Sequence, residues 1–380
     1  MEDIDESKLV DKFIQFGCWN NLNTKVKEDG KRKQLGCLNK VFGLLNDYLT
    51  KVEVKPQFLI ISGDNYYPEK QKMDEVTTNI VIYPDNLREG FRKLQIDLPI
   101  YMMLGNHDLE KTPKEEDPTQ QECKILNLEM ENKPANVEYN FFKYVMLKNG
   151  TMVLMIDTSI YEVDSEKYLQ CYNKFFELSG LNFASIEEIR EYQLQKITEA
   201  IARKELKNII IVGHHPIKYF KYKKPKEGNE AKIQFRGDII NFFKPVLAHI
   251  YGLAPAPNYY YLCSDLHLYQ KGIIQLQMGA DVVMRIQQYI VGTGGTELDS
   301  PLPDNYTKRV KTEADITYTL EDEKAQCGFL ECDATESELV FTPILLGSDK
   351  GKGNKKTKNK RSKRSKRTKK RSKRSKHLKS

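Results

Sequence analysis

Short runs rich in apolar residues, separated by segments of helical periodicity, mark the first hundred residues of the chain. These runs end near residues 17, 62 and 104, and their length is typical of buried strands. Between the first two runs, apolar side chains recur at helical spacing and share one face: Leu35, Leu38, Val41, Phe42, Leu45, Tyr48 and Leu49. A strand, a helix and a second strand in this order predict an α/β fold.

The later part of the chain adds a hairpin, further helices and a series of strands. Asn149-Gly150 separates two β-rich segments and predicts a tight hairpin turn. Ser185 and Glu188 form a capping box for a helix running to about Lys204. Residues 86–95 and 238–251 are predicted helices, and 109–137 an insertion or surface loop. Strands are expected at 208–212, 259–262, 273–278, 282–291, 313–320, 326–332 and 338–346.

The positive charge of the chain is confined to its last residues. The formal net charge is +7, but residues 350–380 hold 18 Lys/Arg and no acid, which leaves 42 Lys/Arg against 53 Asp/Glu in residues 1–349. Hydrophobic residues make up 39% of the chain, enough for a full core. We therefore expect one folded domain over 1–346 and a disordered Lys/Arg/Ser-rich tail over 347–380.

A tail of this composition is expected to bind nucleic acid or another polyanion, with an affinity that falls as salt rises. Alternative interpretations are a nuclear-localisation address, a packaging arm and a solubility tail. The Lys-Arg-Ser pattern also resembles tails of some large-DNA-virus proteins, so a virion-associated protein is one possibility. The cations proposed to contact the polyanion include Lys360, Arg361, Arg364, Arg367, Arg371 and Arg374.

Cysteine usage and the absence of targeting signals suggest an intracellular, cytoplasmic or nuclear protein. The amino terminus is acidic and lacks an apolar core, and no apolar run approaches the ~18 residues of a membrane span. The seven cysteines are odd in number and scattered, so no disulfide framework is expected. A reducing compartment agrees better with this pattern.

Metal-binding residue types follow several predicted strands. Asp64 and Tyr67 come after Gly63 at the end of the strand that starts at Phe58. Four of the six histidines also occur in turns just after strands, in Gly105-Asn106-His107-Asp108, Gly213-His214-His215-Pro216 and Ser264-Asp265-Leu266-His267. Because the carboxyl ends of parallel strands carry ligands in α/β sheets, these groups are candidates for one metal site.

Together these motifs resemble the calcineurin-like metallophosphoesterases, and among them the purple-acid-phosphatase-like branch. The resemblance covers roughly residues 12–295 and is most specific in Gly63-Asp64-Asn65-Tyr66-Tyr67 and Gly105-Asn106-His107-Asp108. It implies a two-sheet β-sandwich flanked by helices. It also implies a binuclear metal hydrolase in which a metal-activated hydroxide attacks a phosphate monoester.

The resemblance assigns roles to individual residues. It implies that Asp64 bridges two metal ions, with Tyr67 and His267 on the first ion. Asn106 and His214 then resemble the ligands of the second ion, and Asp265 is expected to be a metal ligand in place of a family His. The catalytic group is expected to contain His107, which contacts the phosphate, Asp108, which fixes the His107 tautomer, and His215.

Two positions depart from the family pattern. Cys18 stands where the family has Asp, and Asp265 replaces a His that a carboxylate can substitute for. Either Cys18 is a metal ligand, which favours Zn over Fe or Mn, or it is a small buried residue and Asn20 supplies an amide oxygen.

Lys218 and Lys221 follow the His214 motif within a Lys-rich loop. They are either a rim that captures a phosphorylated substrate or part of a solvated charged loop. Two other functions stay open: a degenerate phosphatase fold that acts as a nucleic-acid-associated or structural protein, and a phosphodiesterase or nuclease of the same family.

Overall fold

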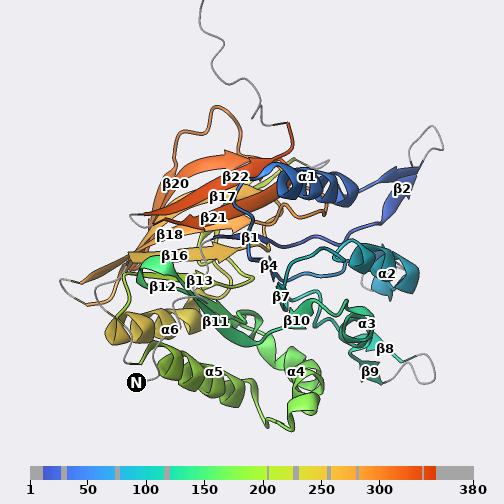
Figure 1. Ribbon diagram of the computed structural model, residues 1–380, viewed down its shortest axis with the longest axis horizontal. Helices are drawn as coiled ribbons and strands as arrows, with labels where there is room; N and C mark the ends of the chain where they lie inside the picture. The colour runs from blue at the N-terminus through green and yellow to red at the C-terminus, as the bar shows by residue number, and fades with distance from the viewer. Residues whose placement is uncertain are drawn as a thin grey trace, which may run out of the picture. The chain divides into compact units, whose positions relative to one another are not determined.

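The computed structural model describes residues 12–26, 32–72, 78–114, 120–202, 205–225, 231–254, 258–279, 282–335 and 338–347. Within them, two mixed β-sheets are flanked by helices (Figure 1). This confirms the predicted α/β fold with two sheets. The basic tail, and with it every cation proposed to bind a polyanion, lies outside the described residues.

The first sheet has the strand order β10-β7-β4-β1-β21-β22. Its four leading strands are parallel, and β21 and β22 are antiparallel additions. Both β1 and β4 are buried along their whole length, which explains why their sequences lack a polar face. The bounds are β10 Val137–Tyr139, β7 Ile100–Met103, β4 Phe58–Ser62, β1 Lys12–Phe16, β21 Gly328–Ala334 and β22 Leu339–Leu345.

The second sheet has the strand order β11-β12-β13-β16-β18-β17-β20-β19. Strands β12, β13, β16 and β18 are parallel, while β11, β17, β20 and β19 are added in antiparallel pairs. The bounds are β11 Phe142–Leu147, β12 Thr151–Ile156, β13 Asn208–Val212, β16 Asn258–Cys263, β18 Val283–Val291, β17 Tyr269–Gln277, β20 Ile316–Lys324 and β19 Val310–Glu313.

Helices cover the outer faces of the sheets. Helix α1 buries Leu38, Val41, Phe42 and Leu45, the face that its helical spacing predicts, and contacts β21. Helices α5 and α6 pack on each other, and α5 contacts β11 (Figure 1). The helices are α1 Leu38–Lys51, α2 Pro84–Arg92, α3 Lys124–Asn132, α4 Leu169–Phe176, α5 Ile186–Ile201 and α6 Ile240–Leu253. Short 3-10 turns are η2 Lys148–Gly150, η3 Ser159–Tyr161, η4 Ser165–Tyr168 and η5 Glu177–Ser179.

The expectation of an irregular insertion at 109–137 is wrong for much of that segment. It contains helix α3, which buries Ile125, Leu126 and Glu129. A carboxyl group on the buried face hides the helical periodicity, because Glu129 counts as polar in the pattern. The sequence also did not predict four small two-stranded sheets. They are β2 Thr24–Val26 with β3 Arg32–Gln34, β5 Glu69–Lys72 with β6 Thr78–Val81, β8 Thr112–Pro113 with β9 Gln121–Glu122, and β14 Tyr219–Lys223 with β15 Lys232–Arg236.

Four of the seven cysteines are paired, which corrects the expectation that the chain has no disulfides. Cys37 bonds to Cys327 and Cys123 bonds to Cys171, whereas Cys18, Cys263 and Cys332 are free and buried. Cys37 and Cys327 are 290 positions apart, and Cys123 and Cys171 are 48 positions apart, so their spacing in the sequence did not indicate that they pair. Since disulfides persist in oxidising surroundings, cysteine usage no longer supports a reducing compartment.

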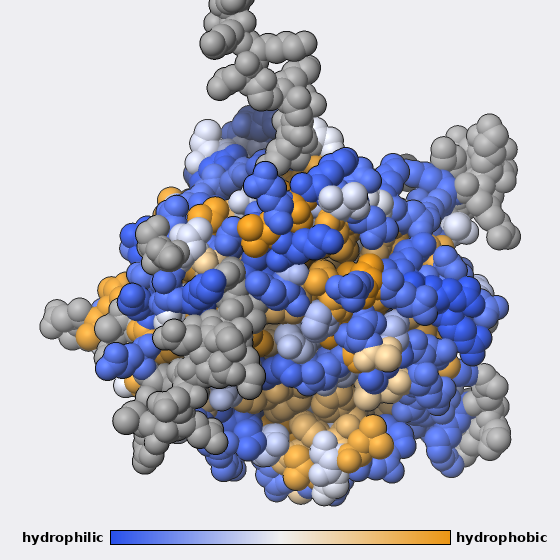
Figure 2. Space-filling view, viewed as in Figure 1, coloured by the Kyte–Doolittle hydropathy of each residue, from blue (hydrophilic) through white to orange (hydrophobic). Residues whose placement is uncertain are grey.

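The surface of the described part shows no broad apolar face in the view of Figure 2, where apolar side chains gather in several smaller areas among polar ones. Isolated apolar side chains are exposed, such as Leu178 and Val163. Among the described helices, none is both long and apolar enough to cross a membrane.

The hairpin turn between β11 and β12 provides a test of the local structure. Asn149 and Gly150 both have positive φ, 64° and 63°, as the Asn-Gly sequence predicts. We expect Gly150→Ala to lower the free energy of unfolding by about 1–2 kcal/mol, because a Cβ is disfavoured at this φ. Gly43→Ala, in the exposed middle of α1, is the matched control and should raise it by about 1 kcal/mol. Urea unfolding of both variants measures the difference, and equal effects would contradict the turn geometry.

Candidate metal centre

The predicted site residues meet where the carboxyl ends of strands from both sheets approach each other. Strands β1, β4 and β7 of the first sheet and β13 and β16 of the second all end there. The two sheets are joined at this point because the Ser62 hydroxyl donates to Ser264 Oγ at 3.2 Å and the Ser264 hydroxyl donates to the Ser62 carbonyl at 2.6 Å. The polar loops that follow the strands are therefore held against one another.

Backbone strain is concentrated in these loops. Cys18, Asp64 and Asp265 have φ of 54°, 57° and 43°, values that residues other than glycine adopt uncommonly. Three of the five such residues in the described chain thus belong to the candidate site. Strain of this kind persists where the surrounding structure imposes it, and it is frequent at functional sites.

Asp64 is at the centre of the cluster and is almost fully buried. Its Oδ2 accepts a hydrogen bond from the Tyr67 hydroxyl at 2.8 Å. Its Oδ1 accepts from the His107 backbone N–H at 3.2 Å and lies 3.2 Å from His214 Nε2. Both carboxylate oxygens therefore face groups that the sequence assigns to the site.

His214 is fixed in one orientation by the strands on either side. Its Nδ1 lies 2.7 Å from the Ser62 carbonyl oxygen, which can only accept, so Nδ1 carries a hydrogen. The other ring nitrogen, Nε2, faces Asp64 Oδ1 and Asn106 Oδ1, both at 3.2 Å. A carboxylate, an amide oxygen and an imidazole nitrogen thus converge on one point.

This convergence of acceptors requires a positive charge. Burial lowers the pKa of His214, but the Asp64 carboxylate outweighs burial and raises that pKa to about 10. Burial likewise opposes ionisation of Asp64, but the charge of His214 holds the pKa of Asp64 well below its ordinary value. The oxygens that favour a positive charge on His214 would also attract a metal cation.

Cys18 extends the cluster on the side of β1. Its Sγ is 3.8 Å from Asp64 Oδ2, and one ligand atom each from Cys18, Asp64 and His214 lie within 4.8 Å of one another. Burial and the nearby Asp64 raise the pKa of the Cys18 thiol well above its ordinary value, so the thiol is neutral unless a cation is bound. Asn20 packs against α2: its amide donates to the Leu87 carbonyl, and its Oδ1, which has no hydrogen-bond partner among the described residues, lies beside Gly90, where an added Cβ would be 2.0 Å away; this is against the alternative that Asn20 supplies the ligand oxygen.

Tyr67, His267 and Asp265 complete the cluster. The Tyr67 hydroxyl lies 3.1 Å from His267 Nε2, so the two groups implied for the first ion are neighbours. Asp265 Oδ1 is 4.0 Å from His214 Nε2, and Asp265 also forms a potential ligand group with His214 and His215. Asp299 accepts from the His267 backbone N–H at 3.0 Å and so positions that turn.

The structure corrects the role expected of Asp108. This carboxylate accepts hydrogen bonds from the backbone N–H groups of Gly105, Asp64 and Asn65, at 2.7, 3.1 and 2.7 Å. It joins the loops after β4 and β7 rather than orienting an imidazole. The group beside His107 Nδ1 is Glu110, at 2.9 Å, which the sequence analysis missed because no motif includes it.

A second buried carboxyl, Glu129 of α3, interacts with Asp108 from behind the site. Burial and the Asp64 charge raise the pKa of Asp108 to about 7, and burial and Asp108 raise the pKa of Glu129 well above its ordinary value. The hydroxyl of Tyr139 donates to Glu129 at 3.1 Å. One proton shared by Asp108 and Glu129 leaves only one of the two carboxyl groups charged, so both can be buried side by side.

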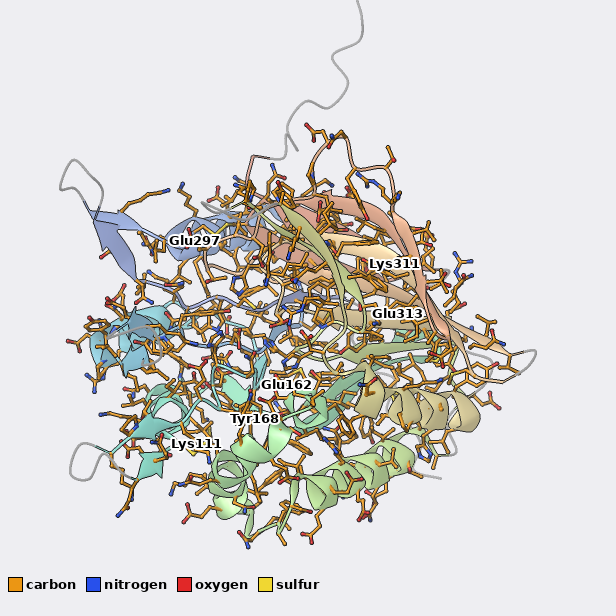
Figure 3. The ribbon with its side chains drawn as sticks, turned by 180° about the vertical axis from the view of Figure 1, so that it is seen from behind. Lys111, Glu162, Tyr168, Glu297, Lys311 and Glu313 are labelled. Atoms are coloured by element: carbon orange, nitrogen blue, oxygen red, sulfur yellow. A yellow bond between two sulfur atoms is a disulfide. The ribbon has the colours of Figure 1, made fainter. Side chains whose placement is uncertain are left out.

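His215 is the neighbour of His214 but makes different contacts. Its Nε2 lies 2.6 Å from Glu162 Oε1, and its Nδ1 lies 3.3 Å from Thr158 Oγ1. Glu162 in turn accepts from the Tyr168 hydroxyl at 3.2 Å, and the two labelled side chains lie together in Figure 3. Glu162 has no signature in the sequence, because it reaches His215 from a 3-10 segment about 50 residues away.

A cavity of about 440 Å³ opens beside the cluster and is lined mainly by polar side chains. Asn106, His215 and Asp265 reach it from the site, and Lys221 and Arg236 reach it from the β14–β15 pair.

Lys218 does not line the cavity. It is buried and pairs with Glu313 at 2.6 Å, a residue labelled in Figure 3, so its expected contact with substrate is wrong.

The buried carboxyl pair generates a testable prediction. Because the pKa values of Asp108 and Glu129 are raised on folding, their contribution to stability is complete below about pH 4 and is lost as the pH rises through about 7 and above. Glu129→Gln keeps a hydrogen-bonding group but removes one titrating carboxyl. Its melting temperature should exceed that of the parent by roughly 2–4 °C at pH 8.5 and by less at pH 5. Glu131→Gln, exposed on the same helix, is the control, and a pH-independent difference would refute the explanation.

Comparison with known proteins identifies the family of the chain. Among solved structures, the chain is similar to GAP50, the anchor in the inner membrane complex of Plasmodium, with a TM-score of 0.46, 13% identity and coverage of 91% of this chain and 87% of that chain. It is also similar to PhoD, with a TM-score of 0.46, 9% identity and coverage of 88% and 68%. A search of curated proteins found no match. The profile of the calcineurin-like phosphoesterases matches residues 12–247, more than half of the chain, and the chain therefore belongs to the calcineurin-like phosphoesterase family.

Proposed function

We propose that this protein is a metal-dependent hydrolase of phosphate monoesters. The observation that supports the proposal most strongly is the buried Asp64 carboxylate, which has Cys18, Tyr67 and His214 around it and a polar cavity beside it. The donor set suits a cation, since carboxylate, amide oxygen, imidazole and thiolate are all metal ligands.

The residues divide into two groups about Asp64. In this proposal Cys18, Tyr67 and His267 would serve one ion, and Asn106, His214 and Asp265 would serve the other. With Asp64 shared, each group offers the nitrogen, oxygen or sulfur ligands of a separate ion. When bound, two ions would supply charge for the phosphoryl oxygens and a means of ionising water near neutral pH.

The side chains around the cations have separate tasks in this proposal. Burial lowers the pKa of His107, but Asp64 outweighs burial and raises it, so His107 can place a positive charge near the phosphate. His215 lines the cavity and its Nε2 lies 2.6 Å from Glu162 Oε1, so this pair is our candidate for proton transfer to a leaving group. Glu162 is then a positioning residue for His215.

Zn²⁺ is the metal that we favour for the ion beside Cys18. A thiol whose pKa is raised by burial loses its proton only to a strong competitor, and Zn²⁺ accepts thiolate together with imidazole and carboxylate. Fe or Mn suits the oxygen and nitrogen ligands of Asn106, His214 and Asp265 equally well. Two ions of different kinds are therefore compatible with the site.

The first prediction concerns metal and activity together. We expect Asn106→Ala to lower turnover of an aryl phosphate by at least about 100-fold and to reduce the metal bound per chain, because one amide ligand is lost. His249→Ala is the matched control: His249 is on α6 and bonds to Thr198 Oγ1 at 2.8 Å, away from the site. Elemental analysis and steady-state kinetics measure both effects. If the two variants retain equal activity and metal, the proposal fails.

The second prediction separates monoesters from diesters. Tyr67 is a ligand type that the nuclease branch of the family lacks, so a mono-aryl phosphate should turn over at least about 10-fold faster than a bis-aryl phosphate of the same leaving group. The Zn-, Mn- and Fe-loaded proteins are to be compared under the same conditions. A preference for the bis-aryl compound would instead support the phosphodiesterase alternative.

A further inference from the structure

We propose that the Cys37–Cys327 disulfide is a redox-modification site, and that its reduction releases the loop that holds Cys18 in the metal centre. The effect on metal binding rests on the proposed function, but the effect on the Cys18 thiol does not. The inference follows from a continuous set of contacts that begins at the disulfide and ends at Cys18.

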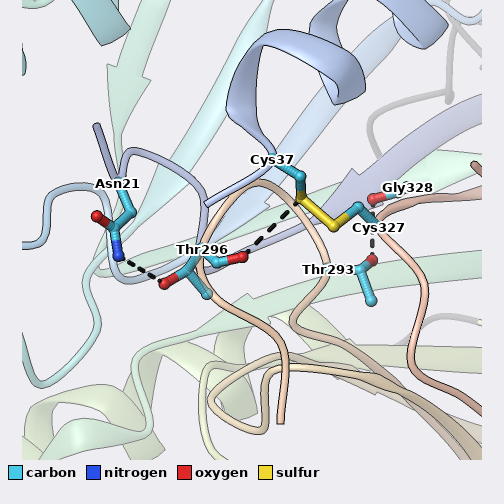
Figure 4. The surroundings of a disulfide bond; sticks show 6 residues. All are labelled: Asn21, Cys37, Thr293, Thr296, Cys327 and Gly328. Atoms are coloured by element: carbon cyan, nitrogen blue, oxygen red, sulfur yellow. Dashed lines mark hydrogen bonds between the residues drawn. A yellow bond between two sulfur atoms is a disulfide. The ribbon is translucent and has the colours of Figure 1, made fainter. Parts of the chain in front are cut away.

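The disulfide closes around a glycine-containing loop, residues 293–296, that follows β18 (Figure 4). Cys37 precedes α1, and its backbone N–H donates to the Gly295 carbonyl at 2.7 Å. On the other side, Gly328, which follows Cys327, donates to the Thr293 carbonyl at 3.0 Å and accepts from Thr293 Oγ1 at 2.9 Å. The two halves of the disulfide therefore hold both ends of the loop.

The same loop holds the backbone on either side of Cys18. The N–H of Gly294 donates to the Gly17 carbonyl at 3.0 Å, and the N–H of Thr296 donates to the Cys18 carbonyl at 3.1 Å. The Asn21 amide also donates to Thr296 Oγ1 at 3.0 Å (Figure 4). Three hydrogen bonds thus tie residues 17–21 to the loop that the disulfide closes.

The 293–296 loop and the segment around Cys18 are in direct backbone contact. A Cβ added at Gly295 would lie 2.1 Å from the Trp19 carbonyl oxygen, and one added at Gly294 would lie 2.6 Å from the Gly17 carbonyl oxygen. Backbone therefore rests directly on backbone at these two positions. A movement of the 293–296 loop has to move the Cys18 segment or break its hydrogen bonds.

Cys18 is the residue most sensitive to such a movement. Its φ of 54° is disfavoured for a side chain with a Cβ and is maintained only by its surroundings. Outside the loop, the Cys18 N–H donates to the Gly63 carbonyl at 3.0 Å, and the neighbouring Trp19 N–H donates to the Asp64 carbonyl at 3.3 Å. Once the loop is free, return to negative φ relieves the strain and carries Sγ away from Asp64.

Reduction of the Cys37–Cys327 bond is an ordinary thiol–disulfide exchange. A dithiol reductant gives two electrons and two protons to the Cys37–Cys327 bond, which becomes two thiols, while the reductant becomes a disulfide. Cys37 is only partly buried, so one end of the bond is within reach of a small reductant. In the reverse exchange a small disulfide takes two electrons and two protons from the Cys37 and Cys327 thiols, which re-forms the bond.

The other disulfide supplies a matched control. Cys123–Cys171 joins the residue before α3 to α4 and belongs to a different hydrophobic cluster from β1 and β4. Loss of either disulfide is expected to lower stability, since both restrain the unfolded chain. Only loss of Cys37–Cys327 should change the surroundings of Cys18.

The test measures the reactivity of each free thiol in Cys37→Ser/Cys327→Ser and in Cys123→Ser/Cys171→Ser. The full-length folded proteins are treated with iodoacetamide, and labelling is followed residue by residue by mass spectrometry. We expect Cys18 to be labelled at least about 10-fold faster in the first variant than in the parent or the second variant. Cys263 and Cys332, which are also buried, should stay protected and so exclude global unfolding.

Two outcomes overturn the proposal. One is equal Cys18 labelling in both double variants, and the other is simultaneous labelling of Cys18, Cys263 and Cys332 in the first variant. A separate measurement adds Zn²⁺. We expect Zn²⁺ to slow Cys18 labelling in the parent protein, and to slow it less in Cys37→Ser/Cys327→Ser. If Zn²⁺ has no effect but Cys18 labelling still differs between the variants, the link between the disulfide and Cys18 is supported and the assignment of Cys18 as a metal ligand fails.

Discussion

The buried Asp64 carboxylate is the constraint on which the rest of the site depends. A carboxylate without water is costly unless opposite charge and hydrogen bonds compensate it. Tyr67, the His107 N–H and the His214 ring supply that compensation, and each comes from a different part of the chain. Such an arrangement is stable with either a proton or a metal cation between the acceptors.

The position of Asp64 between two sheets explains how so many groups reach it. Each strand end contributes one short loop, and the loops are fastened by groups that are not themselves ligands. Ser62 and Ser264 join the sheets, and Asp108 joins the loops after β4 and β7 through three backbone N–H groups. The scaffold therefore holds ligand atoms within a few ångströms without a regular helix or strand passing through the site.

The seven cysteines serve three different purposes in this fold. One pair fastens α3 to α4, and the other closes the loop next to Cys18. Cys263 and Cys332 fill the core as small apolar residues. Cys18 alone lies against the carboxylate cluster, where a thiol adds a soft ligand to otherwise hard oxygen and nitrogen donors. In the two proposals above, metal identity and redox sensitivity are therefore connected through Cys18.

The sequence by itself determined most strands of the two large sheets, most helices and the candidate ligands at strand ends, because periodicity and short motifs are local properties. It placed α1, the Asn149-Gly150 turn and the groups around Asp64. Tertiary structure alone decided the disulfides, the burial of Lys218 against Glu313, and the contacts of His107 with Glu110 and His215 with Glu162. Except for His107 and Glu110, these partners are far apart in the sequence, and no motif records which side chains the folded chain brings within bonding distance.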